Sequence, residues 1–127
     1  MGINRKCLPI PLVTFPVSDA STCHITAKDN EILKSFSNID HEDGGTREIH
    51  PQVVLRYYYG FIVSVWHWQS GIGMEADELD SIEKKLLSLG HSEAYINLCR
   101  VSGLNGCKFL NLDCDGTVYD FFPEYSW

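Results

Sequence analysis

The sequence predicts an α+β fold, with an antiparallel sheet of three to five strands and two or three helices packed mainly on one face. Three observations predict this class. Residues 53–68 form a long run of β-branched and aromatic side chains, residues 74–89 repeat leucine and isoleucine at helical spacing, and an Asp-Gly pair at 115–116 follows a short apolar run. We expect the 127 residues to form a single domain, 1–127, around one core.

The charge balance limits the classes of partner. Seventeen acidic residues against ten basic ones give a formal net charge of −7. Proteins bind nucleic-acid backbones and anionic membranes through clustered lysine and arginine, so neither is an expected direct partner. The balance favours a protein partner with a basic surface.

Cysteine usage and hydropathy indicate the compartment. No apolar run approaches the roughly 20 residues of a membrane span. Three prolines interrupt the first 16 residues, which makes them a poor signal peptide. The five cysteines are odd in number and have no CxxC spacing. We therefore expect reduced thiols in a cytoplasmic protein.

The chain before the first helix is expected to contribute little regular structure. Leu12–Phe15 is a short apolar run between prolines, and proline confines a strand to the edge of a sheet. Ser18–Cys23 is small and polar, which predicts a loop. Residues 1–10 are expected to be loosely ordered.

The first helix is predicted over Ala27–Ser37. Thr26 stands at its N-cap, and Asp29 follows three residues later as a short capping-box partner. His24 precedes the helix, beside Cys23, and two interpretations stay open. It is either a ligand or catalytic residue, or a loop histidine that orders the start of the helix.

Residues 38–50 are polar and contain a Gly-Gly pair, which predicts a mobile loop. Four of its side chains would suit a metal ion by type: His41, Glu42, Asp43 and His50. Zinc sites normally show ligand pairs two to five residues apart on a regular element, which nothing here fixes. A solvated loop is favoured, and no metal is expected.

The run at 53–68 reads VVLRYYYGFIVSVWHW. Its odd positions are nearly all apolar and its even positions are mixed, so one face is expected to meet the core. Gly60 suits a bend or a turn. The run is either one bent central strand or a tight hairpin folded near Tyr59–Gly60, and the single strand is favoured.

Met74–Leu89 is predicted to be a helix that ends at Gly90, because acids load its first turns and lysines lie near its end. Residues 92–103 fit both a helix and an alternating strand. Ser92 can cap a helix, and Gly103, Asn105 and Gly106 can end it, so the helix is favoured.

The segment Lys108–Asp120, KFLNLDCDGTVYD, resembles the first motif of the haloacid-dehalogenase phosphatases, an apolar strand followed by DxDGT. The resemblance implies a nucleophilic Asp113, an acid/base Asp115 and bound magnesium. Only ten residues follow Thr117, which leaves no room for the downstream Ser/Thr, Lys and acidic pair of that chemistry.

A β-hairpin is therefore favoured for the same segment, because Asp-Gly is a strong signal for a two-residue turn. Asp115–Gly116 would form the loop. The apolar face of the ribbon would then carry the pairs Cys114–Thr117, Leu112–Tyr119 and Leu110–Phe121.

Four short segments are similar to pieces that recur in the same order in a small uncharacterised family encoded on bacterial prophage-like islands and conjugative elements. They are STCHIT (21–26), YGF (59–61), LDCDG (112–116) and PEYSW (123–127). Genes on such islands often neighbour anti-restriction genes, and the resemblance supplies no catalytic residues.

No Ser/His/Asp set, phosphate loop or zinc spacing is present, so neither an enzyme nor a cofactor is expected. The favoured function is that of a small acidic inhibitor from a mobile genetic element, of the anti-CRISPR or anti-restriction type. It would block a host defence nuclease, of the CRISPR or restriction type, by occupying the basic nucleic-acid-binding surface of that nuclease. An enzyme acting on a small phosphorylated substrate through the metal ligands Asp113 and Asp115 is the alternative, and an immunity protein for a toxin shares the binding logic. The candidate partner-binding residues are Glu75, Asp77, Glu78, Asp80, Asp113, Asp115, Asp120 and Glu124.

Overall fold

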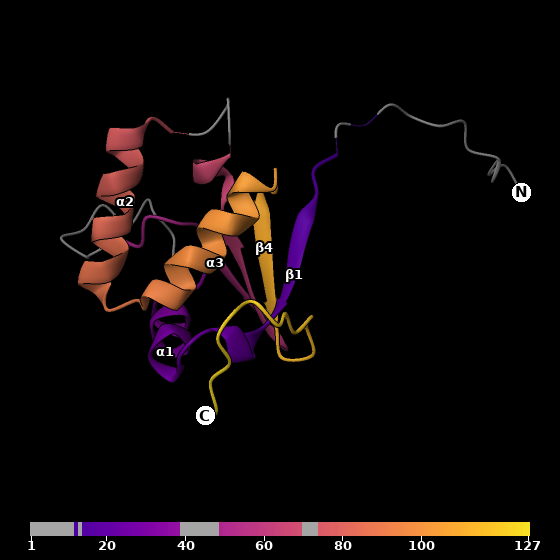
Figure 1. Ribbon diagram of the computed structural model, residues 1–127. Coiled ribbons are helices and arrows are strands. Elements are labelled where there is room, and N and C mark those ends of the chain that lie inside the picture. Colours follow the sequence, from indigo (N-terminus) through magenta and orange to yellow (C-terminus); the bar gives the residue numbers. More distant parts are fainter. Residues whose placement is uncertain (1–11, 13, 39–48, 70–73) are drawn as a thin grey trace, which may run out of the picture.

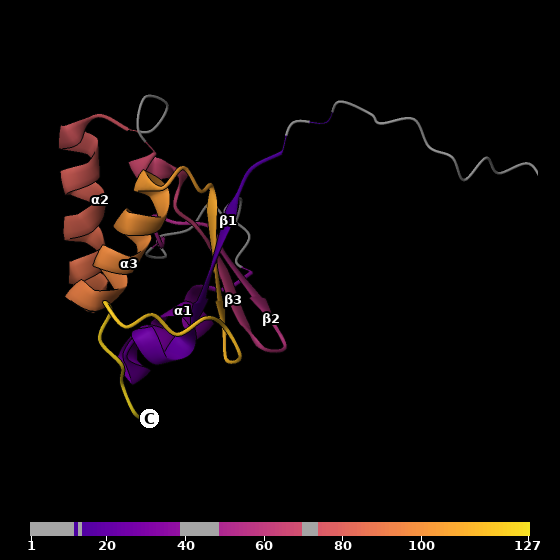
Figure 2. The ribbon, with the colours of Figure 1, turned by 45° about the vertical axis from the view of Figure 1, so that its right-hand side comes forward.

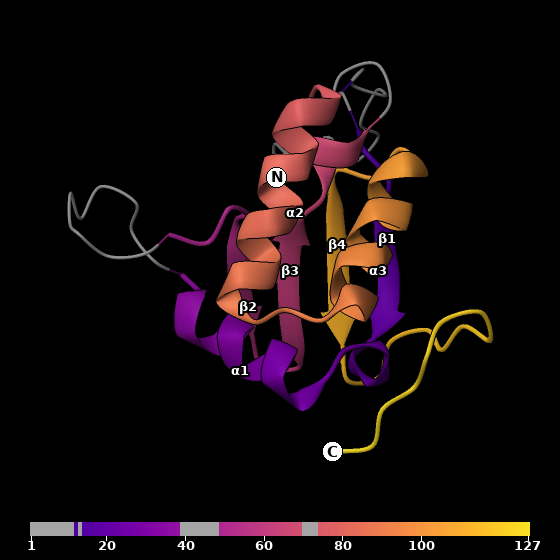
Figure 3. The same cartoon turned by 60° about the vertical axis from the view of Figure 1, so that its left-hand side comes forward.

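The structure is a computed structural model that describes residues 12, 14–38, 49–69 and 74–127. Within these residues a four-stranded sheet has the order β1-β4-β3-β2, and three α-helices lie on one face of it (Figures 1, 2 and 3). The expected α+β class is confirmed. The elements are β1 Val17–Ser21, η1 Thr22–His24, α1 Ala27–Phe36, β2 Val54–Tyr57, β3 Gly60–Ser64, η2 Trp66–Trp68, α2 Ala76–Leu89, α3 Glu93–Leu104 and β4 Phe109–Asp113, where η is a 3₁₀ helix.

Some predictions fall on residues outside this part of the chain. The segment 1–10, predicted to be loosely ordered, lies entirely outside the described residues, and so does most of the predicted mobile loop 38–50. His41, Glu42 and Asp43 lie there as well. These predictions stay untested.

The sheet is mixed, because β4 has an antiparallel neighbour in β3 and a parallel neighbour in β1. The prediction of a loop over Ser18–Cys23 was wrong, since most of that segment forms the edge strand β1. The predicted Asp-Gly hairpin was also wrong. The chain turns at residues 113–116 but no strand returns, because both edges of β4 are already hydrogen-bonded.

Gly116 serves the packing of this turn rather than a hairpin loop. A Cβ at this position would lie 2.4 Å from the carbonyl oxygen of Ala20 in β1. A Cβ atom essentially never approaches another non-bonded heavy atom this closely, so a residue without a side chain is required where the turn crosses the end of β1.

The single bent strand predicted over Val53–Trp68 was wrong, and the alternative hairpin is present. Strands β2 and β3 pair with Tyr57 opposite Gly60, which leaves Tyr58 and Tyr59 as a two-residue turn. A Cβ on Gly60 would lie 1.8 Å from the carbonyl oxygen of Leu112, so glycine permits β3 to approach β4 at the turn. After β3 the chain enters η2 instead of continuing the sheet.

The three helices begin and end where local chemistry indicates. In α1, Thr26 and Asp29 form both hydrogen bonds of the predicted capping box. Helix α2 ends at Gly90, whose φ of 104° is the left-handed conformation expected for a glycine after a helix. The helical interpretation of residues 92–103 is confirmed, and Ser92 caps α3 by accepting the N–H of Tyr95.

The core lies between the helices and the covered face of the sheet. Inward side chains of β3 and β4 alternate along each strand, and they pack with α1, α2 and α3. Removing one such fully buried leucine is expected to cost about 2–5 kcal/mol. The core includes Phe61, Val63, Leu110, Leu112, Leu33, Leu86, Tyr95 and Ile96. Of the helices in the described residues, none has the length and hydropathy needed to cross a membrane.

Both edges of the sheet carry added hydrogen bonds. Asn38, at φ 55°, donates its N–H to Val54 and accepts the N–H of Arg56 with its side chain, so it substitutes for a neighbouring strand along β2. Along β1, Thr117 accepts the N–H of Ser21, and the Tyr119 hydroxyl donates to the carbonyl of Asp19. Edges occupied in this way are poor templates for pairing with another chain.

Candidate functional site

Three features carry most of the polar chemistry of the described chain: one end of the sheet, its uncovered face, and a buried network behind it. The first is the end at which β1 and β4 finish and the β2–β3 turn lies, in the lower part of Figure 1. Residues 21–26, 59–61, 112–116 and 123–127, which carry the family resemblance, all lie there, and we call this region the motif end.

Backbone hydrogen bonds hold the four segments of the motif end together. Cys114 donates its N–H to Tyr59 (2.9 Å), and Tyr125 donates its N–H to Cys23 (2.7 Å). The indole N–H of Trp127 donates to the carbonyl of Ile25 at 3.0 Å. The C-terminal tail is therefore fixed against the start of the first helical region.

His24 anchors the tail and is 1% exposed. Its Nε2 accepts the N–H of Tyr119 at 2.9 Å, so its proton is on Nδ1, which donates to the carbonyl of Pro123 at 2.8 Å. The ring also contacts Tyr119 and Phe122. With both nitrogens used, His24 positions the tail, and the ligand or catalytic interpretation has no free ring atom to support it.

Asp113 stabilises the turn after β4. Its Oδ1 accepts the N–H of Asp115 (2.8 Å), and its Oδ2 accepts the hydroxyl of Tyr57 (2.5 Å), which reaches across β3. The bond from Tyr57 is the main cause that lowers the pKa of Asp113. Partial burial, followed by the hydrogen bond to Asp113, raises the pKa of Tyr57 to about 12.

The same turn contains the described side chains best spaced for a metal ion. One ligand atom each from Asp113, Cys114 and Asp115 lies within 4.8 Å of the others. A hard cation such as Mg²⁺ accepts carboxylate oxygens but keeps several water ligands. Both carboxylates are accessible, so weak binding of such an ion is chemically compatible with the turn.

The uncovered face of the sheet, which we call the open face, combines apolar and acidic side chains. Apolar members lie on all four strands, and their exposed fractions include 53% for Val17 and 44% for Leu55. Asp19 and Asp113 lie on the β1–β4 side, on either side of Asn111. The open face comprises Val17, Asp19, Leu55, Tyr57, Ile62, Phe109, Asn111 and Asp113.

The sequence did not single out Asp19, because residues 18–23 read as a loop. Its Oδ2 accepts both the N–H (3.1 Å) and the hydroxyl (2.8 Å) of Thr117. The signal that could have placed it is the alternation after Pro16, in which Val17 and Asp19 point one way and Ser18 and Ala20 the other.

The predicted partner-binding acids form two separate groups. Those at the start of α2 are exposed and lie at the top of Figures 1 and 3, whereas the turn after β4 and the tail lie at the bottom. Asp80 pairs with Lys84 at 2.9 Å. The structure brings Asp113 and Asp115 together and does not bring them near the α2 group, which comprises Glu75, Asp77, Glu78 and Asp80.

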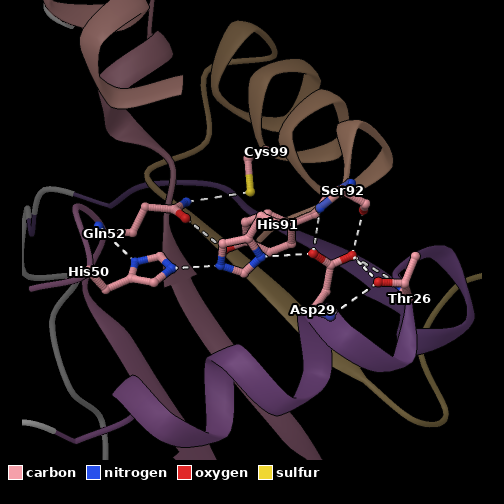
Figure 4. Close-up of polar contacts among 8 residues, drawn as sticks. Thr26, Asp29, His50, Gln52, His91, Ser92 and Cys99 are labelled. Atoms are coloured by element: carbon pink, nitrogen blue, oxygen red, sulfur yellow. Dashed lines mark hydrogen bonds and ion pairs between the residues drawn. The ribbon is translucent and has the colours of Figure 1, made fainter. Parts of the chain in front are cut away.

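Behind the sheet, a buried carboxylate joins two helices (Figure 4). Asp29 is fully buried and accepts five hydrogen bonds: two from Thr26, two from Ser92 and one from His91. Burial alone would raise its pKa, but the bonds from His91, Ser92 and Thr26 outweigh burial and lower the pKa to about 2. The start of α1 is thereby fastened to the start of α3.

Two histidines extend this network, and both are 3% exposed. Gln52 donates its N–H to Nδ1 of His50 at 3.1 Å, so His50 is protonated at Nε2 and donates to Nε2 of His91 at 2.8 Å. His91 then donates from Nδ1 to Asp29 at 2.8 Å. Burial and the neighbouring His91 lower the pKa of His50 to about 3, so the His50 ring is neutral in this arrangement.

The network ends at α3. Tyr95 donates its hydroxyl to Gln52 (2.7 Å), and the Gln52 amide donates to Ser64 (2.8 Å) and to the sulfur of Cys99 (3.4 Å). Burial raises the pKa of Cys99 to about 12, so its thiol is not a nucleophile at neutral pH. The members of the network are mostly buried and spend their polar atoms on hydrogen bonds to one another, so we interpret the network as structural.

No disulfide involves the four described cysteines, Cys23, Cys99, Cys107 and Cys114. Only Cys114 is exposed, and Cys23 is partly exposed beside it in one pocket of the motif end. This agrees with the expectation of reduced thiols as far as these residues extend.

A family model described as "Family of unknown function (DUF5983) C-terminal domain" matches residues 17–127. The match covers most of the chain, so the protein belongs to this family. No curated protein and no solved structure matches the chain significantly.

Proposed function

We propose that this protein is a small acidic binding protein of a mobile genetic element. It acts in the cytoplasm by inhibiting a host defence nuclease, of the CRISPR or restriction type, and it does so by occupying the basic nucleic-acid-binding surface of that nuclease. The observation that carries the proposal is the open face, where apolar side chains are bordered by Asp19 and Asp113 and none of the described helices covers the strands.

The open face suits a protein partner for two reasons. Contiguous exposed apolar side chains rimmed by polar ones mark interaction surfaces. The carboxylates at its border, together with the net charge of −7, complement a basic partner and raise the rate of encounter. A surface that binds nucleic acid is basic, so an acidic protein can compete for it.

The two acidic ends suggest the extent of the contact. Helix α2 has 14 residues, which corresponds to a length of about 21 Å, and it separates its own first-turn acids from the motif end. Carboxylates at such a separation match phosphates spread along several base pairs of a bound duplex. A long groove would therefore contact both ends of the molecule, and a compact basic pocket only one.

Two other functions share these features in part. An immunity protein would use the same open face against the basic surface of a cognate toxin. A metal-dependent enzyme acting on a small phosphorylated substrate is favoured by one observation, the spacing of Asp113, Cys114 and Asp115 within 4.8 Å.

The test compares two leucines of equal exposure. Leu55 on the open face is 44% exposed and Leu87 on α2 is 43% exposed, so arginine at either position should leave the fold intact. The parent protein and the two variants are immobilised, exposed to lysate of the natural host, and the captured proteins are identified by mass spectrometry. Purified partner is then assayed for nucleic-acid binding and cleavage with increasing amounts of each protein.

We expect Leu55→Arg to lose capture and inhibition and Leu87→Arg to keep both. Capture that is equal for all three proteins would contradict the role of the open face. A specific partner that is not a nucleic-acid enzyme, or one that still binds nucleic acid when saturated, would contradict the inhibitor proposal. A captured toxin would instead support the immunity alternative.

The acids of α2 have a separate test, the triple reversal Asp77→Lys, Glu78→Lys and Asp80→Lys. These residues are exposed, so we expect a lower association rate and weaker inhibition. The melting temperature should fall slightly, since lysines oppose the helix N-terminus. Binding by the parent should weaken with salt, because exposed charges are screened over about 10 Å at 0.1 M. Unchanged binding and no salt effect would refute the charge mechanism.

A further inference from the structure

A pocket at the motif end lies on the other side of the β2–β3 hairpin from the open face, between the hairpin turn and α1. Its lining residues include two cations, an amide and three aromatic rings: Asn30 and Lys34 from α1, Arg56, Tyr58 and Tyr59 from the hairpin, and Trp127 from the tail. Asn30 and Lys34 are four residues apart and so share one face of α1. The inhibitor function proposed above uses none of these six side chains.

The two cations of the pocket are available to a ligand. Lys34 makes a 3.5 Å pair with Glu31, and both side chains are exposed, so this pair is weak. No described carboxylate pairs with the guanidinium of Arg56, whose backbone N–H alone bonds to Asn38. By contrast, Lys84 and Arg100 on the helix layer both have carboxylate partners. In a chain of net charge −7, two such cations in one pocket indicate an anionic ligand.

The residues of the hairpin turn are not the types that such turns prefer. Two-residue hairpin turns prefer Asn-Gly or Asp-Gly, whose residues adopt positive φ. Here Tyr58 and Tyr59 occupy the turn, and neither has a positive φ. Tyr58 is 92% exposed and Tyr59 is 53% exposed, with their ring centroids 4.8 Å apart. Large rings held in solvent at a turn provide a surface on which a planar group can stack.

Trp127, at the end of the tail, also lines the pocket. Its indole N–H donates to Ile25 at 3.0 Å, which fixes the ring while 55% of the residue stays exposed. The Asn30 side chain adds one hydrogen-bond donor and one acceptor. The pocket therefore offers charge for a phosphate, rings for a planar base and an amide for polar edges.

We propose that this pocket binds a free mononucleotide, with the phosphate at Lys34 and Arg56 and the base on the tyrosine or tryptophan rings. A free nucleotide fits better than a nucleic-acid strand. Cys114 lines the pocket and lies between Asp113 and Asp115 in the turn after β4. These carboxylates would repel the successive phosphates of a strand. The proposal does not rest on the inhibitor function, and Tyr57 is the one open-face residue that also lines the pocket.

The test is a titration of ¹⁵N-labelled protein followed by NMR. The probes are the four common ribonucleoside monophosphates, adenosine, inorganic phosphate and a short single-stranded oligonucleotide. We expect at least one monophosphate to give saturable shifts at Thr22, Asn30, Gly60 and Cys114. Adenosine and phosphate alone should bind about tenfold more weakly, since each satisfies one half of the pocket.

Three variants sharpen the result, all at exposed positions that should not affect folding. Arg56→Gln should weaken nucleotide binding about tenfold and Tyr58→Ser about threefold. Lys84→Gln removes the same charge from α2, outside the pocket, and should leave binding unchanged. Variant spectra without ligand confirm that the fold is retained.

The absence of saturable shifts with every monophosphate would overturn the proposal. Equal binding of phosphate and nucleotide would refute the stacking role of the rings. Tighter binding of the oligonucleotide than of any monophosphate would refute the choice of a free nucleotide. Unchanged affinity in Arg56→Gln would show that the ligand lies elsewhere.

Discussion

Asp29 and Asp113 make similar local contacts and have different consequences. Each accepts a backbone N–H and a hydroxyl, and hydrogen bonding lowers the pKa of each. Asp29 is fully buried and has five donors, whereas Asp113 is partly exposed at the motif end and has two. Burial therefore separates them: the first carboxylate is committed to the fold, and the second keeps lone pairs that a partner can reach.

The largest effect is expected for Asp29→Asn. The substitution removes the buried charge and places an amide N–H₂ against donors from Thr26, Ser92 and His91. Breaking a buried, hydrogen-bonded charge network typically costs about 3–5 kcal/mol. Urea unfolding measures the loss. Asp115→Asn, in the exposed turn, is the matched control, and its free energy of unfolding should stay within about 0.5 kcal/mol of the parent's. Equal losses in the two variants would remove the distinction between the regions.

The second effect is acid sensitivity of the buried network. His50 has a pKa of about 3 in the fold against 6.5 in the unfolded chain, so between these values only the unfolded chain binds the proton. Stability should therefore rise with pH across this window, by about 1.4 kcal/mol per pH unit for one proton. Asp29 contributes stability that is fully present when the pH is above the carboxyl's unfolded pKa of 3.8. This stability is lost as the pH falls toward the folded pKa of about 2.

Urea unfolding of the parent and of His50→Asn at about pH 4.5, 5.5 and 7 checks this dependence. The slope of the free energy of unfolding against pH is compared between the two proteins, and one proton corresponds to about 1.4 kcal/mol per pH unit. The variant should show a flatter profile, because the group with the lowered pKa is gone. Burial also lowers the pKa of His67, which leaves part of the slope in both proteins. Identical slopes would show that His50 does not stay neutral in the fold.

A smaller effect is expected for His24→Ala, at the boundary between core and motif end. The variant loses the bonds to Tyr119 and Pro123 and should be less stable by about 2 kcal/mol. Release of the tail should make residues 119–127 more sensitive to chymotrypsin. Val118→Ala, at a residue that is 52% exposed and is not a chymotrypsin cleavage site, is the control that should change neither property. Unaltered proteolysis in His24→Ala would mean that other contacts hold the tail.

The smallest effect is expected for Asp113→Asn. An amide oxygen can still accept the N–H of Asp115, and Tyr57 can donate to Asn111 instead, so stability should change by less than about 1 kcal/mol. Thermal melting with and without millimolar Mg²⁺ gives a second measurement, and no shift is expected for either protein. A rise in melting temperature that Mg²⁺ causes in the parent and not in the variant would favour the enzyme alternative.

The sequence by itself determined the elements whose causes are local. The capping box of Thr26 and Asp29, the left-handed Gly90 and the Ser92 cap each involve residues within a few positions of one another, so their patterns predicted the helices correctly. The class of fold followed from the periodicities of these segments. The acids at the start of α2 were likewise placed correctly on an exposed helix end.

Only the tertiary structure decided the pairings between distant segments. The Asp-Gly signal at 115–116 predicted a hairpin, but β1, about ninety residues earlier in the chain, occupies that side of β4, and a local pattern cannot register such a competitor. Asp29 is a second example. The sequence predicted it as a capping-box residue, but it also accepts hydrogen bonds from His91 and Ser92, which are 62 and 63 residues away. Side chains meet across such separations because a buried polar atom without a partner costs free energy, so most are paired, and the packing of the core determines which partner is in reach.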